Sequence, residues 1–455
     1  MKEILANAFY SGSPGQSWVG LWSHPRSQAA DYTSLAFWNR LALTCEEGLL
    51  DGVFFADALG VRDVYKGSAA GSLRTGSFAP ALDPMMLIPA MAAVTRHLTF
   101  GVTGNATYET PYLLARRLST LDHLTGGRLA WNVVTGTIEA ASRAVGRDEW
   151  IAHDKRYEAL GEYMDLMYKL WECSWEDGAV VRDKSTGTYA DPSLIHQIDH
   201  DGPFYKCHGV HLCEPSPQRT PLIFSAGSSP AGMEFLARHA ECAFIAGSSK
   251  DKVAASVRDI RERVAACGRD PSDVKVFLGM TIVAAPTEGE ARELRADYAR
   301  HCDVEGMLAF KSGYIGVDLS KYSLDDPLPS QKTNASQSAL KQYTSQTIRD
   351  LASFAPMPGQ ETFLIGSTQQ VCDEIMGWVR DTDIDGINLM RTVEPEGLES
   401  FCRLVVPELQ NRGVYKTAYR EGTLRQKMFG RGDRVAPTHP AAQLREALLP
   451  TLSPV

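Results

Sequence analysis

Short apolar segments alternate with amphipathic segments along the first two-thirds of the chain. Eight of the apolar segments read as buried strands, and they span residues 4–8, 52–56, 98–103, 129–134, 222–226, 243–246, 274–283 and 386–390. Between the first two, apolar residues recur every four positions at Phe37, Leu41, Cys45 and Leu49. This spacing gives a helix one apolar face. Strands that alternate with helices are typical of parallel α/β sheets, and eight of them predict a closed (β/α)8 TIM barrel.

Two long stretches exceed what a minimal barrel needs, one after strand 4 and one after strand 7. Residues 136–218 contain one helix, at about 154–171, and then a loop-rich stretch with hairpin character. Residues 284–370 contain a charged helix near 288–301, a Ser/Pro/Lys-rich stretch and a further helix. Long insertions in barrels usually form active-site walls or lids. We expect one domain over residues 1–430 and a C-terminal tail over residues 431–455 that packs on the surface or on a partner subunit.

The composition is that of a globular, acidic protein. The 455 residues are 44% hydrophobic and 22% charged, and the formal net charge is −9. An acidic chain repels phosphate backbones, so we expect no nucleic-acid partner. The most basic stretch, residues 420–434, is interrupted by acidic residues and reads as a solvated tail.

The apolar runs and the cysteines indicate a cytoplasmic protein. No run reaches the ~18 apolar residues of a membrane-spanning helix, and the N-terminus has no apolar leader segment. The nine cysteines are scattered and form no CxxC pair, as expected for reduced thiols. A group of metal-binding residue types lies in the predicted hairpin: Cys207, His208, His211 and Cys213. Their spacing matches no standard zinc site, so we expect no bound metal.

Polar and small residues follow several predicted strands. Asp57 ends the second strand, Thr103 the third, and Asn132 lies near the end of the fourth. The carboxyl ends of barrel strands meet at the active-site face, so these side chains are expected to lie close together. Each also has a structural explanation, because such residues serve caps, turns and strands.

The segment AGSSPAG, residues 226–232, follows a strand and begins a helix. Its small residues, with Gly227 among them, let the backbone approach an anion, and the first helical N–H groups favour negative charge. The hydroxyls of Ser228 and Ser229 can add hydrogen bonds. An ordinary helix cap would have the same sequence. No Walker A motif and no GxGxxG after the first strand accompany it, so a nicotinamide dinucleotide fold is not supported.

One further pair of polar residues lies in the first insertion. His153 and Tyr157 are four residues apart, so they share one face of a helix. Charged neighbours make this face polar, and a solvated surface pair is the alternative.

Six long segments carry a resemblance across nearly the whole chain. They are EEGLLDGVFFADALG (46–60), YETPYLLARRLSTLDHLTGGRLAWNVVTG (108–136), HDKRYEALGEYMDLMYKLW (153–171), HDGPFYKCHGV (200–210), AGSSPAGMEFLARHAECAF (226–244) and VVPELQNRGVYKTAYREGTLRQ (405–426). In this order they resemble the bacterial-luciferase-like flavin-dependent monooxygenases. More narrowly, they resemble the nitrilotriacetate / dibenzothiophene-sulfone monooxygenase family.

The resemblance implies a barrel with FMN at its C-terminal mouth. Carried over position by position, it implies FMN contacts from Asp57, Thr103, His153, Tyr157 and Ser228. Asn132, Gly227 and Ser229 would belong to the same cofactor site. His153 and Tyr157 would also be the catalytic pair, with His153 as the acid/base candidate because imidazole titrates near neutrality. A histidine that only positions the flavin is the alternative.

The implied reaction uses reduced FMN and O₂, through a C4a-peroxyflavin, to oxygenate a small organic substrate, with C–S or C–N cleavage in some relatives. A separate NAD(P)H-dependent flavin reductase would supply the FMNH2, and relatives form homodimers or homotetramers. Two alternatives remain, an F420-dependent oxidoreductase of the same superfamily and a non-catalytic flavin-binding protein. The chain departs from the family at Ser225, where relatives usually carry Gln, and over residues 302–345. No arginine cluster lies near the matched core, which favours a neutral or singly charged substrate.

Overall fold

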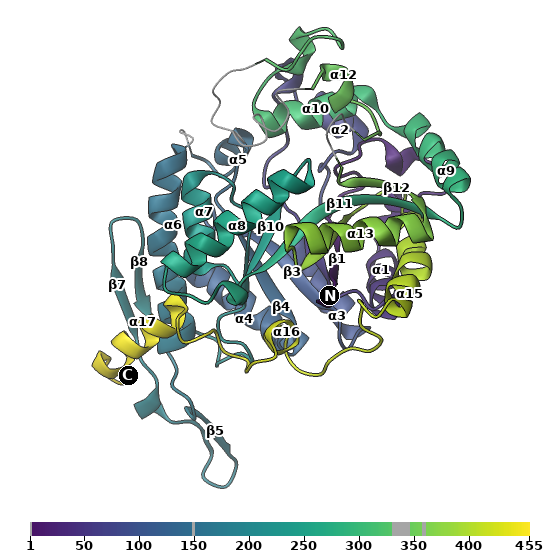
Figure 1. The fold of residues 1–455 in the computed structure, drawn as a ribbon. Helices are drawn as coiled ribbons and strands as arrows, with labels where there is room; N and C mark the ends of the chain where they lie inside the picture. The colour runs from purple at the N-terminus through teal and green to yellow at the C-terminus, as the bar shows by residue number, and fades with distance from the viewer. Residues whose placement is uncertain (1, 148–150, 330–345, 357–360) are drawn as a thin grey trace.

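Eight parallel strands close into a barrel in the computed structural model, which describes residues 2–147, 151–329, 346–356 and 361–455 (Figure 1). Hydrogen bonds between β1 and β13, and between β10 and β11, complete the ring. The predicted TIM barrel is therefore confirmed. Its strands are β1 (Leu5–Tyr10), β2 (Gly52–Phe55), β3 (Thr99–Asn105), β4 (Leu129–Val134), β9 (Leu222–Ser225), β10 (Cys242–Ile245), β11 (Lys275–Ala285) and β13 (Gly386–Met390).

Helices surround the barrel, and several begin where the sequence predicts. Pro111 opens α4 and Pro230 opens α7, and the charged helix α9 spans Glu288–His301. The predicted helix at 154–171 is α6 with a π-helical turn after it, Lys169–Cys173. The longer helices around the barrel are α1 (Leu35–Glu47), α3 (Pro84–Ala93), α4 (Pro111–Thr125), α6 (His153–Tyr168), α7 (Pro230–His239), α8 (Lys250–Ala266) and α13 (Thr368–Thr382).

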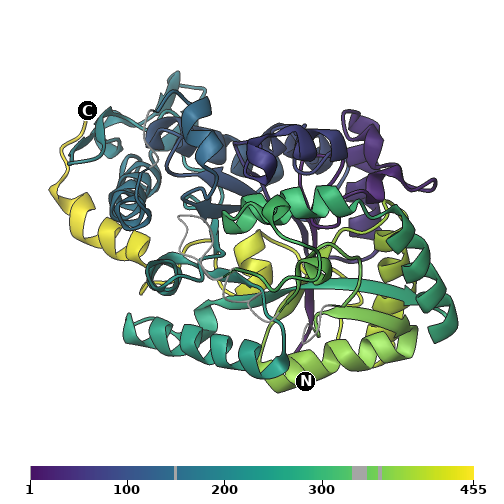
Figure 2. The same cartoon turned by 90° about the horizontal axis from the view of Figure 1, so that it is seen from above.

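The two predicted insertions follow β4 and β11. The first holds α5 (Glu139–Ala144), α6 and two hairpins, β5–β6 (Val180–Asp183, Thr188–Ala190) and β7–β8 (Ile198–Asp201, Lys206–Gly209). The second holds α9, α10 (Val304–Ile315) and α12 (Ile348–Leu351). Seen from above, α10 lies over the middle of the molecule, close to α2 (Ala70–Thr75) (Figure 2). Part of the predicted Ser/Pro/Lys-rich stretch lies outside the described residues.

One strand of the second insertion was not predicted. β12 (Phe363–Ser367) pairs with the upper half of β11, where Thr281 lies opposite Phe363. β11 is eleven residues long, and its lower half pairs with β10 and β13 inside the barrel. The aromatic rings of Trp18 and Phe354 pack on Phe363. This strand thus depends on partners that are distant in sequence, which a local pattern does not reveal.

Aromatic side chains fill the barrel interior. Phe9, Phe54, Phe224, Phe244 and Phe277 pack against one another with ring centroids 5.2–5.7 Å apart. Below them, α16 (Leu424–Phe429) covers the base of the barrel, since its residues bond to the segments that precede β3, β4 and β9. The interior is therefore a packed core and not a channel.

The prediction of a solvated tail over residues 420–434 is wrong for Arg425. Its guanidinium is buried and pairs with both carboxylate oxygens of Glu241, at 2.7 and 2.8 Å. It also donates to the carbonyl of Thr220 at 3.0 Å. A buried charge is tolerated where its pairing and hydrogen bonding are complete, as they are here.

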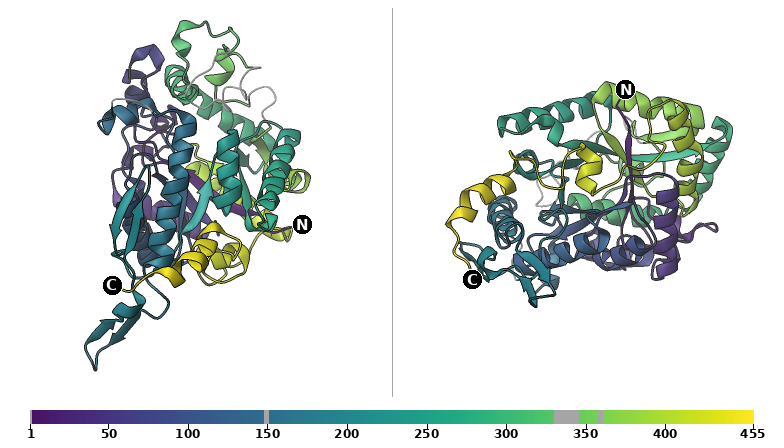
Figure 3. Two further views of the ribbon diagram at one scale, coloured as in Figure 1. Left: turned by 90° about the vertical axis from the view of Figure 1, so that its left-hand side faces the viewer. Right: turned by 90° about the horizontal axis from the view of Figure 1, so that it is seen from below.

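Residues 431–455 lie against the chain's own barrel. The helix α17 (Pro440–Leu448) packs on α6 and on the π-helical turn. His439 is buried and its Nε2 lies 2.9 Å from the carbonyl of His239. In Figure 3 the tail lies at the opposite end of the molecule from α10 and α12. None of the described helices combines the length and the hydrophobicity that a bilayer-spanning segment requires.

Candidate active site

A cavity of about 910 Å³ lies at the carboxyl ends of the strands. Its wall includes Asp57 after β2, Asn105 at the end of β3 and Thr135 after β4, together with residues 225–231 after β9. The first insertion contributes Tyr157, and the second contributes Tyr314 from α10. The cavity therefore occupies the face where TIM barrels hold their active sites, and both insertions help to enclose it.

The predicted anion cradle forms part of this wall. Gly227, Ser228 and Ser229 all line the cavity. The Ser229 hydroxyl accepts a hydrogen bond from the Gly232 amide at 3.1 Å and so caps α7. A Cβ on Gly227 would lie 2.7 Å from the Cα of Gly232, so the turn requires glycine at this close approach. The resulting tight strand-to-helix turn presents helix N-terminal amides to the cavity, the arrangement that binds phosphate groups.

Tyr157 on α6 lies beside the cradle. A Cβ on Gly232 would lie 2.9 Å from the Tyr157 hydroxyl, and this hydroxyl is hydrogen-bonded to the Ser229 side chain. Burial raises the pKa of Tyr157 above its usual value, so the phenol is neutral at pH 7. His153 is the first residue of α6, and its side chain lies outside the described residues.

Arg156, which was not among the predicted site residues, lies in the same wall. Its side chain is buried and lines the cavity. Burial lowers the pKa of the guanidinium, but arginine stays charged at neutral pH. The helix pattern already marks Arg156 as unusual, because it lies on the same helix face as Leu160 and Met164, which are both buried. A charge on an apolar helix face is a feature that calls for a ligand or a partner.

Asp57 lies at the cavity edge with a perturbed carboxyl. Burial raises its pKa to about 6, against the opposing effect of a hydrogen bond from the Ala58 amide. The negative charges of Asp83 and Glu109 raise the pKa of Asp57 further. The group therefore changes charge within the pH range of ordinary assays.

Thr103 and Asn132 lie opposite each other on β3 and β4, deeper in the barrel. The Thr103 hydroxyl donates to the Phe55 carbonyl at 2.8 Å and accepts from Asn132 Nδ2 at 2.9 Å. Neither residue is among those that line the cavity, whose wall on these strands starts at Asn105 and Val133. The Asn132 Oδ1 atom is buried and, within the described residues, has no hydrogen-bond partner. Such an acceptor fits a ligand N–H group.

The hairpin cysteines and histidines do not converge on one point. Cys207 is buried on β8, and His208 pairs with Asp199 at 3.0 Å on the surface. His211 is buried, with its Nε2 at 3.0 Å from the Ser119 hydroxyl.

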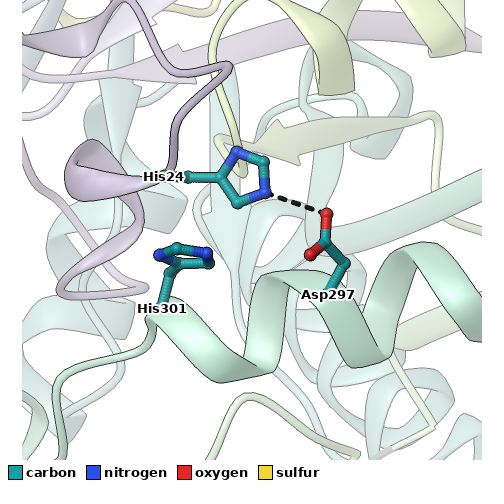
Figure 4. Close-up of side chains that lie close together, drawn as sticks. All are labelled: His24, Asp297 and His301. Carbon is teal, nitrogen blue, oxygen red and sulfur yellow. Dashed lines mark hydrogen bonds and ion pairs between the residues drawn. The ribbon is translucent and has the colours of Figure 1, made fainter.

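A different group, His24, Asp297 and His301, does converge, between the N-terminal segment and α9 (Figure 4). The His24 Nδ1 atom accepts from the backbone N–H of Arg26 at 3.2 Å, so the ring proton is on Nε2. That proton is donated to Asp297, 3.0 Å away. Arg26 and Arg300 also pair with the Asp297 carboxylate. These bonds engage the carboxylate oxygens and fasten the N-terminal segment to α9.

The closed parallel barrel has a large cavity at the carboxyl ends of its strands. An anion cradle and a titratable carboxyl group lie in the wall of this cavity, and together these features define a barrel enzyme. The family model of luciferase-like monooxygenases matches residues 18–385. The chain belongs to this family and is a monooxygenase.

Individual relatives extend over nearly the whole chain. The dimethyl-sulfide monooxygenase of Hyphomicrobium sulfonivorans is 44% identical, over 98% of this chain and 94% of its own length. The long-chain alkane monooxygenase of Geobacillus thermodenitrificans is 43% identical, over 98% of each. The solved structure of a riboflavin lyase with modified FMN and riboflavin has a TM-score of 0.91 and 35% identity, over 98% of this chain and 100% of that one. Nitrilotriacetate and dibenzothiophene-sulfone monooxygenases are also among the relatives, so the narrower resemblance is confirmed.

Proposed function

We propose that this protein binds reduced FMN in the cavity at the barrel mouth and uses it, with O₂, to oxygenate a small organic substrate. The observation that carries the proposal is the cradle, whose residues 226–231 line one cavity together with Tyr157 and Arg156. A phosphate needs amide donors, hydroxyls and a cation, and all three are present in that wall. The cavity of about 910 Å³ also leaves room for a flavin ring beside the phosphate.

Five of the predicted cofactor residues line the cavity: Asp57, Tyr157, Gly227, Ser228 and Ser229. Ser228, with the neighbouring backbone amides and Gly227, would hold the phosphate, with Ser229 and Tyr157 fixed beside it by their mutual hydrogen bond. Asp57 would meet the isoalloxazine edge, whereas Thr103 and Asn132 lie deeper than the residues that line the cavity.

When bound, reduced FMN supplies the two electrons that activate O₂, so that one oxygen atom enters the substrate and the other becomes water. The chain's own residues orient the reactants and exclude water. Apolar side chains such as Ile138, Leu160 and Phe235 line the cavity, and Tyr314 brings α10 to its rim. His153, at the start of α6, would hold or move a proton at its imidazole, whose unperturbed pKa is near 6.5.

The electron supply would come from a second protein, an NAD(P)H-dependent flavin reductase, in the cytoplasm. One relative, from Aminobacter aminovorans, is named component A of its monooxygenase, which fits a system of several proteins. We further propose that the chain forms a homodimer or homotetramer, as predicted from the family resemblance.

The substrate would be small and neutral or singly charged. The relatives at 43–44% identity are named for dimethyl sulfide and long-chain alkanes, which are apolar molecules. The cavity wall agrees, because Ala58, Leu59, Val133 and Ile138 contribute apolar surface. Ser225, where the sequence departs from its relatives, lines the same cavity and leaves more room than a Gln. We therefore favour a thioether or hydrocarbon over a polycarboxylate.

An F420-dependent reaction is the weaker alternative. The solved F420-dependent alcohol dehydrogenase is 13% identical to this chain, so it shares the fold alone. Several relatives above 30% identity, by contrast, bear monooxygenase names.

The decisive experiment combines cofactor binding with oxygen labelling. Purified protein is titrated anaerobically with reduced FMN and with reduced F420. It is then supplied with a flavin reductase, NADH, ¹⁸O₂ and a panel of thioethers and alkanes. We expect binding of reduced FMN and one ¹⁸O atom in one product by mass spectrometry. Preferential binding of F420, or FMN binding without labelled product from any panel member, would contradict the proposal.

The raised pKa of Asp57 gives a prediction for the pH dependence. Below about pH 6 its carboxyl gains a proton and loses its charge as an acceptor, so turnover is expected to fall on the acid side of that value. In Asp57→Asn this acid limb, which is the fall of activity below about pH 6, should vanish. The remaining activity should be low and nearly independent of pH. The measurement is kcat/KM from pH 5 to 8. Asp63→Asn, whose carboxylate pairs with Arg143 outside the cavity, is the control and should keep the limb. An unchanged limb in Asp57→Asn would refute the role.

A further inference from the structure

We propose a second binding site at the base of the barrel, at the opposite end from the FMN cavity, for a small organic monocarboxylate. A cavity of about 250 Å³ lies there between the barrel and the segment that leads from α16 to α17. The segment supplies Phe429, Val435 and Pro437, and the barrel side supplies Arg269 and Glu241. None of these residues lines the cavity at the mouth, so the two sites are separate.

Arg269 is the residue that indicates a ligand at this site. Its side chain is 4% exposed and lines the basal cavity. Its Nη1 donates to the carbonyl of Ala237 at 2.8 Å, while its buried Nε has no hydrogen-bond partner within the described residues. A buried guanidinium with an unused donor is costly, because the charge has lost water without full replacement. An anion in the basal cavity would give this guanidinium a partner of opposite charge.

The carboxylates that could serve Arg269 are already engaged. Glu241 holds Arg425 through both oxygens, at 2.7 and 2.8 Å, and Asp273 pairs with Arg431. The charged side chains of the cavity wall are four arginines (Arg269, Arg425, Arg431 and Arg434) and two acids (Glu241 and Asp273). His439, the remaining titratable group there, is neutral at pH 7 because burial lowers its pKa to about 4. Arg434 pairs with Glu172 and Asp177 outside the wall, so within the described residues Arg269 is the wall arginine that has no carboxylate partner.

The shape and the walls of the cavity select the class of anion. Phe429, Val435, Ala436 and Pro437 give it an apolar side. A volume of about 250 Å³ is below the range of drug-sized ligand pockets, so the ligand is small. A planar carboxylate matches the side-on edge of a guanidinium, and an apolar body matches the opposite wall. Benzoate and short-chain fatty acids have this combination of features.

Binding there would couple the carboxyl-terminal segment to the barrel. One wall of the cavity is residues 429–439, and the other is the barrel base with Arg269. A ligand that bridges the two would hold α17 in place against α6. Thermal stability and the proteolysis rate of the tail should both respond to its concentration.

The test is calorimetric titration of the full-length protein with sodium benzoate, benzamide and inorganic phosphate. We expect benzoate to bind and to raise the melting temperature, and the uncharged benzamide not to bind. Arg269→Gln should weaken benzoate binding at least about 10-fold, the effect of losing a charged hydrogen bond. Arg420→Gln removes the same charge from the exposed Arg420–Glu3 pair nearby and should change nothing.

A second variant tests the site independently, in case Arg269→Gln does not fold. Ala436→Phe fills the cavity from its other wall and keeps the guanidinium. It should abolish benzoate binding while FMN binding and turnover stay as in the wild type. Equal affinity for benzamide, phosphate binding without benzoate binding, or unchanged benzoate affinity in Ala436→Phe would each overturn the proposal. FMN binding is measured on the same samples, so failure of the basal site is distinct from failure of the proposed function.

Discussion

Gly227→Val is expected to lower the affinity for reduced FMN by at least ~100-fold, or about 2.7 kcal/mol. The reason is steric. A Cβ at position 227 would lie 2.7 Å from the Cα of Gly232 and 2.9 Å from its carbonyl carbon and oxygen. These are backbone atoms that cannot rotate away, so the turn between β9 and α7 would have to open. Opening it would displace the amides around Ser228 from the phosphate position, and the anion site would be lost.

The effect can be separated from a general loss of stability. Gly289 lies on α9, and a Cβ there would meet nothing within 4 Å. Gly289→Val is therefore the matched control, with the same change of side chain in open space. Both variants are titrated with reduced FMN, followed by flavin fluorescence, and their unfolding is followed by circular dichroism. Gly227→Val with wild-type flavin affinity would refute the cradle as the phosphate site.

His153→Ala is expected to lower turnover by ~100-fold, the usual contribution of a positioned acid or base. His153 begins α6, one helical turn before Tyr157, whose hydroxyl is bonded to the cradle through Ser229. Its neighbours Asp154 and Arg156 line the cavity. Unperturbed imidazole titrates near neutral pH, which suits a group that holds or moves a proton.

The kinetic pattern of this variant distinguishes the two roles that the sequence left open. A lower kcat with unchanged affinity for reduced FMN indicates proton transfer, and a lower affinity with unchanged kcat indicates flavin positioning. His208→Ala, on the exposed hairpin strand β8, is the control and should match the wild type. If His153→Ala changes neither flavin affinity nor the ratio of product to O₂ consumed, the assignment is wrong.

The fold could be predicted because the barrel strands are read from local pattern. Strands buried on both faces are short apolar runs between helices with a four-residue repeat. This pattern predicts all eight barrel strands to within two residues at each end, but it misses β12, which pairs with β11 outside the barrel. β12 and the burial of Arg425 were not predicted, for one physical reason. Arg425 is neutralised by Glu241, 184 residues away in sequence, and β12 is stabilised by β11. Long-range partners leave no periodic signal.

The candidate site shows the same division between local and distant information. The cradle and Asp57 were identified because strand ends and turn residues are local signals, and the structure brings both to one cavity. Thr103 and Asn132 proved to lie deeper than the cavity wall. Tyr314 was not identified, since it reaches the rim from α10, in a region with no recognisable pattern. Arg156 has a local signal, because it is a charged residue on a helix stripe that is otherwise apolar and buried.

The pairing of β1 with β13 has a consequence for synthesis of the chain. Leu5 lies opposite Gly386, so one edge of β1 has no partner in the barrel until nearly the whole chain has been made. During translation at ~5–20 residues per second, that edge waits on the order of 20–80 s. An unpaired strand edge invites association with other chains. Production of this protein should therefore depend more on chaperone supply and translation speed than on the stability of the finished barrel.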